Sequence, residues 1–495
     1  MLARRLGLTA ADAPLLAGGL VLLLAAAYLS TIVGAGLSLG ALALLALLLL
    51  VVTAFLATPH LAVAVTIPLF VLIPVIKVLA LPWLGPLKDL VTVGAILASL
   101  MLVIQRSATG ERIKADSWAV GLALLLIGLY VANLGGRLER DAAWLHGMRL
   151  NALPLMLLIA GMALPNPRRT LRWATASLIA TAVFVALVGI AQQAIGVERL
   201  NELGFEYDLH LRTIEGRLRS FGTLDDPFAY AALLMFAFAA VLMWMRRGAI
   251  AVAAGTIIAA GLTVSYVRSA IIIAFALVAV WLARKRQTTV SFFLMLFAAV
   301  VAGFLLVRSS GATEGRTVRA GPNFFLTVNG RTDAWSIIFD KPSAMPFGQG
   351  VGEVGTAADR ATYTVSRSAE EARSAEGAIV DSSYFATIGD IGVIGLALLI
   401  ALFGRLLVLA LRAERAGSRA GALALGLLTV MILDPLARES LTGFPTAFLG
   451  FLMLGLATAA AHQEVEERVE EAPVYNRRPS PQGKRRSHLG PAGAR

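Results

Sequence analysis

Cysteine is absent from this chain of 495 residues, and charged residues are scarce, at 15% of the total. Without a thiol, the protein forms neither a disulfide nor a thiolate metal site. Soluble domains carry about a quarter of their residues as Asp, Glu, Lys and Arg, so the low charge content excludes an ordinary soluble protein. The formal net charge of +12 predicts no nucleic-acid partner, because the basic residues stand at the ends of apolar runs.

Hydrophobic residues make up 58% of the chain and form runs long enough to cross a lipid bilayer. We expect an all-α polytopic integral membrane protein with about 14 transmembrane helices. The predicted helices centre near residues 24, 47, 71, 97, 126, 157, 183, 237, 258, 276, 298, 398, 427 and 452. Residues 1–463 form the predicted transmembrane domain, and residues 464–495, rich in charge and proline, form a predicted disordered basic cytoplasmic tail.

The basic residues predict the orientation of these helices. Clusters near residues 106–114, 168–172, 246–247, 284–286 and 412–419 alternate so that they fall on one side. That side, with both termini, is expected to be cytoplasmic. Residues 308–380 then form a large extracytoplasmic loop between the eleventh and twelfth helices. Arginines on the outer side oppose this charge bias, so each needs either an acidic neighbour or an anionic ligand.

Two outer arginines, Arg217 and Arg219, precede Ser220-Phe221-Gly222 and the predicted helix near residue 237. Guanidinium groups bind phosphate through paired hydrogen bonds, and a turn at Gly222 would hold Arg219 over the mouth of a cavity. Alternatively, both arginines are topological anchors that Asp225 and Asp226 neutralise. Spacing alone does not decide between these interpretations.

Arg268 lies at a predicted membrane boundary, within Ser265-Tyr266-Val267-Arg268-Ser269. A charge at this position is costly unless it faces a polar cavity or a partner. The alternative is a side chain that reaches out to the lipid headgroups.

The large loop holds Arg331, ahead of a possible amphipathic helix at residues 332–339, and a turn with Gly348, Gly350 and Gly352. In some proteins such a turn binds an anion through its backbone N–H groups, and in others it only reverses the direction of the chain. Asp381 stands where the loop re-enters the membrane. It is a candidate general base toward a sugar hydroxyl, or the N-cap of the helix that follows.

Metal binding and cofactor binding have no support in the sequence. The five histidines have no mutual ligand spacing, and no Asp-x-Asp pair or Walker-type glycine loop occurs. We therefore expect a protein that works without a metal or a cofactor.

Taken in order, these segments resemble the O-antigen ligase and O-antigen polymerase superfamily of membrane glycosyltransferases. The matching segments lie within residues 215–400, and they are Arg219-Ser220-Phe221-Gly222 with Asp226-Pro227, Ser265 to Ser269, Gly330-Arg331 to Gly350, and Asp381-Ser382-Ser383-Tyr384 before Gly392 to Gly395.

The resemblance implies a donor glycan on a polyprenyl diphosphate at the outer face of the cytoplasmic (inner) membrane, and metal-independent transfer to an acceptor hydroxyl. It assigns Arg219 and Arg268 to the diphosphate, and Arg331 to the diphosphate or to loop architecture. Asp381 is assigned to the acceptor hydroxyl. Arg217 and Tyr384, in the same motifs, are further substrate-binding candidates.

The ligase branch typically has a histidine at the position of Asp381 and an asparagine at that of Ser382. This departure favours a polysaccharide polymerase, which transfers the glycan to the acceptor sugar of another lipid-linked repeat unit of an exopolysaccharide, capsule or O-antigen. The alternatives are a ligase, a lipid-linked oligosaccharide flippase, and a peptidoglycan-type glycosyltransferase. Membrane lipids, a chain-length regulator and a flippase are the candidate partners.

Overall fold

The computed structural model describes residues 35–81, 84–109, 115–133, 141–205, 211–214, 216–246, 248–287, 289–290, 294, 345–352, 354–355 and 382–471. Within these ranges the fold is helical apart from one small hairpin, and eight helices are long and apolar enough to cross a membrane. The chain is therefore a multi-pass membrane protein, which confirms the predicted class.

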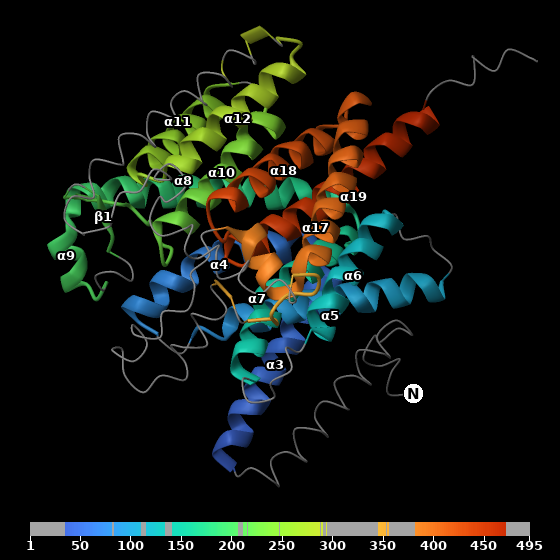
Figure 1. The fold of residues 1–495 in the computed structure, drawn as a ribbon, viewed down its shortest axis with the longest axis horizontal. Helices are drawn as coiled ribbons and strands as arrows, with labels where there is room; N and C mark the ends of the chain where they lie inside the picture. Colours follow the sequence, from blue (N-terminus) through green and yellow to red (C-terminus); the bar gives the residue numbers. More distant parts are fainter. Residues whose placement is uncertain are drawn as a thin grey trace, which may run out of the picture.

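The helices form a single bundle (Figure 1). Those that meet the length and hydropathy of a membrane span are α4 (Pro59–Leu79), α5 (Leu87–Ala108), α7 (Asp141–Ala163), α8 (Pro167–Ile195), α10 (Pro227–Trp244), α17 (Ser383–Arg415), α18 (Arg419–Ala437) and α19 (Thr446–Glu471). The other elements are α3 (Ala35–Ala57), α6 (Ser117–Ala132), α9 (Val197–Glu202), β1 (Thr213–Ile214), β2 (Arg217–Leu218), α11 (Ala249–Val264) and α12 (Arg268–Arg284).

Each predicted helix centre from 47 to 276 and from 398 to 452 falls inside one of these helices. The predicted centres 24 and 298 lie outside the described residues, as does most of the loop at 308–380. The shortest of the matching helices, α6 and α11, have 16 residues each, or about 24 Å of helix at 1.5 Å per residue.

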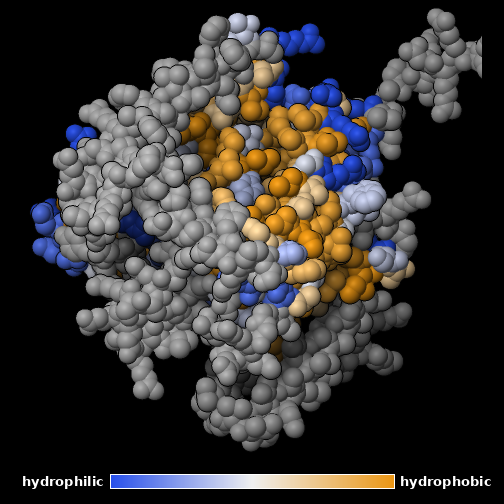
Figure 2. Space-filling model, in the orientation of Figure 1, coloured by the Kyte–Doolittle hydropathy of each residue, from blue (hydrophilic) through white to orange (hydrophobic). Residues whose placement is uncertain are grey.

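Apolar side chains cover the outside of the bundle as well as its interior. Val65, Leu125 and Ile250 are 62%, 60% and 78% exposed, and Figure 2 shows hydrophobic side chains covering the face over α17 and α18. A helix that is apolar all round suits a lipid environment, because lipid chains solvate the outward side chains. Small residues allow close packing inside: a Cβ on Gly161 of α7 would lie 2.5 Å from the carbonyl oxygen of Leu452 in α19.

The two ends of the bundle differ in chemistry. The end that carries the hairpin, the α11–α12 connection and the first residues of α10 and α17 is named here the motif end. The opposite end, where α10, α12, α17 and α19 finish, is the basic end. Ion pairs join helices there, between Arg168 and Glu467 and between Arg284 and Glu414.

Helix α19 continues to Glu471, into the segment predicted to be a disordered tail. Glu464 explains the extension, because its carboxylate accepts hydrogen bonds from the Ser418 hydroxyl at 2.7 Å and the Arg419 backbone N–H at 2.9 Å. These contacts tie α19 to the start of α18. Residues 472–495 lie outside the described part of the chain.

Candidate functional site at the motif end

A two-stranded hairpin positions Arg219. Strands β1 and β2 are antiparallel with Ile214 opposite Arg217, and the backbone N–H of Arg219 donates to the Arg212 carbonyl at 2.8 Å. Side chains alternate along a strand, so Arg217 and Arg219 share one face while Leu218 points to a small core with Phe221. Arg217 is exposed and Arg219 is half-buried.

Helix α8 holds the segment after Arg219. The Gln192 side chain accepts hydrogen bonds from the backbone N–H groups of Phe221 at 3.1 Å and Gly222 at 2.9 Å, and donates to the Gly222 carbonyl at 2.8 Å. The Ser220 hydroxyl donates to the Gly189 carbonyl at 2.6 Å. Gly222 has φ +60, and a Cβ there would lie 2.8 Å from the Tyr230 ring. The Ser-Phe-Gly part of the motif is therefore architecture that fixes Arg219.

Asp226 serves as the N-cap of α10. Its Oδ1 accepts from the backbone N–H groups of Phe228 at 2.7 Å and Ala229 at 2.8 Å. The interpretation in which Asp226 only neutralises the nearby arginines is thus incomplete, because one carboxylate oxygen is occupied by the helix end.

Arg268 is the first residue of α12, beside Arg219. The preceding turn contains Tyr266 at φ 51, and the Ser265 hydroxyl accepts from the Val267 backbone N–H at 3.2 Å. The Ser265 carbonyl accepts from Nε of Arg219 at 3.5 Å. The structure therefore brings together two of the residues that the sequence singled out, Arg219 and Arg268.

Phe228, in the first turn of α10, lies among three guanidinium groups. The guanidinium carbons of Arg219, Arg438 and Arg212 are 4.7, 5.7 and 5.8 Å from the centre of its ring. Cations at such distances are attracted to the face of an aromatic ring. The ring is thus a shared support that keeps like charges close together. We call Arg212, Arg219, Arg268 and Arg438 the arginine cluster.

Arg438, which sequence analysis missed, joins this cluster to the start of α17. Its guanidinium forms a buried two-point ion pair with Asp434, with Nε–Oδ1 at 2.7 Å and Nη2–Oδ2 at 2.5 Å. Its carbonyl accepts from the Ser383 backbone N–H at 3.2 Å. The spacing of Asp434 and Arg438, four residues apart at a helix end, was the available sequence signal.

The first residues of α17 are fastened to the end of α18. Ser382 donates its hydroxyl to the Pro435 carbonyl at 2.9 Å, and the Tyr384 hydroxyl donates to the Ile432 carbonyl at 2.8 Å. Ser382 is the N-cap residue of α17 by backbone geometry, without a side-chain cap bond. Asp381, which precedes it, and Arg331 lie outside the described residues.

Positive charge is concentrated at this site. The pKa of Arg219 is lowered to about 10, mainly by burial and then by the neighbouring charge of Arg212, with smaller contributions from Arg268 and Arg438; Asp226 acts in the opposite direction. Arg219 therefore stays protonated at neutral pH. An anion bound here would relieve the repulsion among these cations.

The glycine-rich turn at residues 345–352 docks on a break in α17. Gly392 has φ 75 and ψ −176 inside that helix, and the Gln349 backbone N–H donates to the Gly389 carbonyl at 2.6 Å. The Gly352 backbone N–H donates to Oδ1 of the buried Asp390 at 3.1 Å. A Cβ on Gly348 would lie 2.5 Å from the Asp390 backbone. Both N–H groups are satisfied within the chain, which favours a packing role for this turn.

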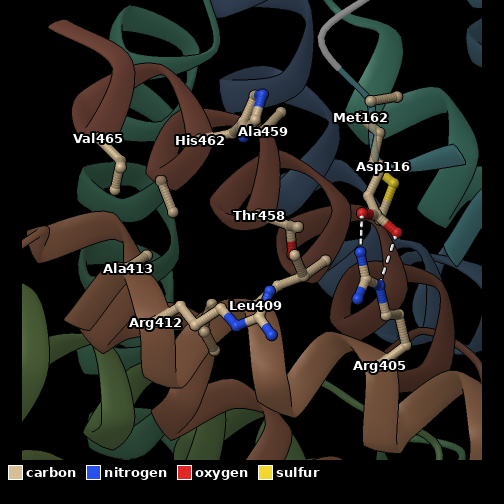
Figure 3. A pocket seen from close by; sticks show the side chains of 14 residues that line it. Asp116, Met162, Arg405, Leu409, Arg412, Ala413, Thr458, Ala459, His462 and Val465 are labelled. Atoms are coloured by element: carbon tan, nitrogen blue, oxygen red, sulfur yellow. Dashed lines mark hydrogen bonds and ion pairs between the residues drawn. The ribbon is translucent and has the colours of Figure 1, made fainter. Parts of the chain in front are cut away.

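A separate cavity of about 330 Å³ opens at the basic end, between α6, α17 and α19. Figure 3 shows the ion pair between Asp116 and Arg405 along its wall, with Arg412 and His462 on other sides. The Arg405 guanidinium holds the pKa of Asp116 below its usual range. Because the two charges satisfy each other at 2.6 Å, we interpret the pair as a tie between α6 and α17.

The fold and this cluster define a multi-pass helical membrane protein with an arginine-rich site at one end of its bundle. Comparison with known proteins adds no relative, since no family model matches the sequence and no curated protein is similar to it.

Proposed function

We propose that this protein is a metal-independent polysaccharide polymerase of the cytoplasmic membrane. It transfers a polyprenyl-diphosphate-linked glycan to the acceptor sugar of another lipid-linked repeat unit. In this proposal about 14 helices cross the membrane, both termini are cytoplasmic, and residues 308–380 form the extracytoplasmic loop. The observation that carries the proposal is the arginine cluster, whose members come from three segments far apart in the sequence: three of them surround one aromatic ring, and Arg268 interacts electrostatically with Arg219.

The charge distribution supports a diphosphate as the ligand. Asp434 pairs with Arg438, but Arg219 still lies among like charges, and an anionic ligand would offset this repulsion. Arg268 begins α12, and the positive end of a helix dipole favours an anion nearby. A diphosphate offers several oxygens to the forked guanidinium groups, which bind such groups through paired hydrogen bonds.

The proposed reaction follows from this site. The acceptor hydroxyl oxygen forms a bond to the anomeric carbon of the donor glycan, and the bond from that carbon to the diphosphate oxygen breaks. Polyprenyl diphosphate leaves with the electron pair, and the hydroxyl proton passes to Asp381. The arginines stabilise the negative charge that develops on the leaving diphosphate. No cofactor takes part.

The remaining candidates have places in this scheme. Asp381 directly precedes Ser382, and the next residue, Ser383, donates its backbone N–H to the Arg438 carbonyl at 3.2 Å. The general base would thus stand near the diphosphate site. Arg331 is proposed as a further diphosphate contact from the loop, and Arg217 and Tyr384 as contacts to the glycan. A chain-length regulator or a flippase is the proposed protein partner.

The test uses purified protein in lipid vesicles, supplied with lipid-diphosphate-linked repeat units and neither metal nor nucleotide. We expect a ladder of glycan products with the wild type and none with Arg268→Ala. Arg268→Lys should recover little, because one ammonium does not form the paired contact. The matched control is Arg199→Ala on α9, where the arginine is exposed. Asp381→Asn should also abolish the ladder, since an amide does not take the proton.

Other products would change the conclusion. Transfer of one glycan to an added lipid acceptor, without a ladder, would show a ligase. Movement of the donor across the vesicle membrane without any transfer would show a flippase. A full ladder from Arg268→Ala would remove Arg268 from the reaction.

A further inference from the structure

A second cavity at the basic end has an unassigned role. It measures about 910 Å³ and lies between α10, α11 and α12, with Arg419 contributed by the first turn of α18. The arginine cluster lies at the other end of the same helices, since α10 begins next to Phe228 and α12 begins at Arg268.

The cavity has two chemically distinct zones. Trp244, Trp281 and Val252 belong to a wall of aromatic and aliphatic side chains, and Val252 is 69% exposed. Arg246, Lys285 and Arg419 stand at the ends of the helices that form this wall. Tryptophan and basic residues at helix ends are typical of the boundary between lipid chains and headgroups.

The basic zone carries a surplus of positive charge. Arg284 is paired with Glu414, with Nε–Oε1 at 2.9 Å. Within the described part of the chain, the side chains of Arg246, Lys285 and Arg419 form no ion pair, and the described residues that line the cavity include no carboxylate. An anionic group at this position is therefore the complementary ligand.

We propose that this cavity binds an anionic glycerophospholipid. The phosphate headgroup lies against Arg246, Lys285 and Arg419, and the acyl chains lie along Trp244 and Val252. A free phosphate would match the basic zone but would leave the apolar wall without a partner. A neutral lipid would match the wall but would leave three cations without a counter-charge. An anionic phospholipid satisfies both zones, and basic pockets between membrane helices are known to bind such headgroups.

The test is native mass spectrometry of the delipidated full-length protein with phosphatidylglycerol or phosphatidylcholine of the same acyl chains. We expect phosphatidylglycerol to bind at least about tenfold more tightly, because each basic side chain near the headgroups contributes roughly a factor of five. The triple variant Arg246→Gln, Lys285→Gln, Arg419→Gln should bind both lipids equally. A matched control removes three exposed arginines of the same end outside the cavity, by Arg169→Gln, Arg172→Gln and Arg415→Gln. This control should keep the preference.

A further variant tests the apolar zone. Gly255 lines the cavity, and a Cβ there would meet only the Val241 side chain, at 3.5 Å. The Gly255→Leu variant should fold, and it should reduce phosphatidylglycerol binding because the leucine side chain would occupy the space along the apolar wall. Equal binding of the two lipids to the wild type, or an equal loss in both triple variants, would overturn the proposal. Displacement of the lipid by an equal concentration of glycerol 3-phosphate would also overturn it, by showing a site for a soluble phosphate.

Discussion

The Arg219→Lys substitution offers the sharpest test of the arginine cluster, because it keeps the charge and changes only the geometry. In the wild type, Nε of Arg219 donates to the Ser265 carbonyl at 3.5 Å and the guanidinium carbon lies 4.7 Å from the centre of the Phe228 ring. Among the described residues, none accepts a hydrogen bond from its two terminal nitrogens, which in the proposal bind the ligand. A lysine ammonium supplies one compact charge without a fork.

The expected loss can be worked from these contacts. Stacking of the guanidinium on Phe228 contributes about 0.5–2 kcal/mol, of which lysine keeps a part. A charge-assisted hydrogen bond contributes about 1.5–3 kcal/mol, and lysine loses one of the two paired bonds to the diphosphate. A combined loss of about 2–4 kcal/mol corresponds to a rate about 30- to 1,000-fold lower.

The assay measures initial rates of glycan transfer in vesicles, with each variant at the same density of folded protein. Arg199→Lys, at an exposed position of α9, controls for a general effect of replacing arginine at this end. A rate for Arg219→Lys within about threefold of the wild type would show that only charge is required, and would refute the two-point contact with the diphosphate.

Three further predictions follow from the same contacts. Gly348→Ala should abolish glycan transfer although the protein still inserts into the membrane normally, because φ is +85 there and the new Cβ would lie 2.5 Å from the Asp390 backbone. Limited proteolysis should then cleave the turn at residues 345–352 faster than in the wild type. Asp434→Ala should lower the midpoint of thermal unfolding, since breaking a buried ion pair costs about 3–5 kcal/mol; an unchanged midpoint would contradict the buried pair with Arg438. Transfer should fall as the pH rises toward about 10, the lowered pKa of Arg219. The folded state disfavours the charge on Arg219, so deprotonation of this side chain relieves repulsion and does not destabilise the fold. Circular dichroism should therefore show intact helices across that pH range.

The sequence was sufficient for the multi-pass helical class, for the positions of the described helices and for part of the candidate site. Apolar runs predict spans directly, because each must match the thickness of the bilayer. Arg219 and Arg268 stood out for a related reason, since a charge next to an apolar run requires a partner. The positive φ at Gly222 confirms the turn predicted after Arg219, whereas the turn at Tyr266 was not predicted.

The contacts between helices that assemble the candidate site could not be predicted from the sequence. In the sequence, nothing distinguishes Phe228 from the other aromatic residues of an apolar helix, or Gln192 from the other polar residues of its helix. Their roles depend on α8, α10 and α18 meeting at one point, which no local pattern encodes. The glycine turn was ambiguous for the same reason, because only its partner Asp390 reveals what its N–H groups bind.

Main-chain atoms make several of the contacts that dock the glycine turn on α17, beside the contact to the Asp390 carboxylate. Gln349 contributes its N–H, Met345 and Pro346 contribute carbonyls to Val393 and Ile394, and glycines make the close approach possible. Substitution of Phe347, which is 61% exposed, should therefore leave these hydrogen bonds intact. Exposed side chains of the turn can vary while the main-chain hydrogen bonds that seat it on α17 are kept.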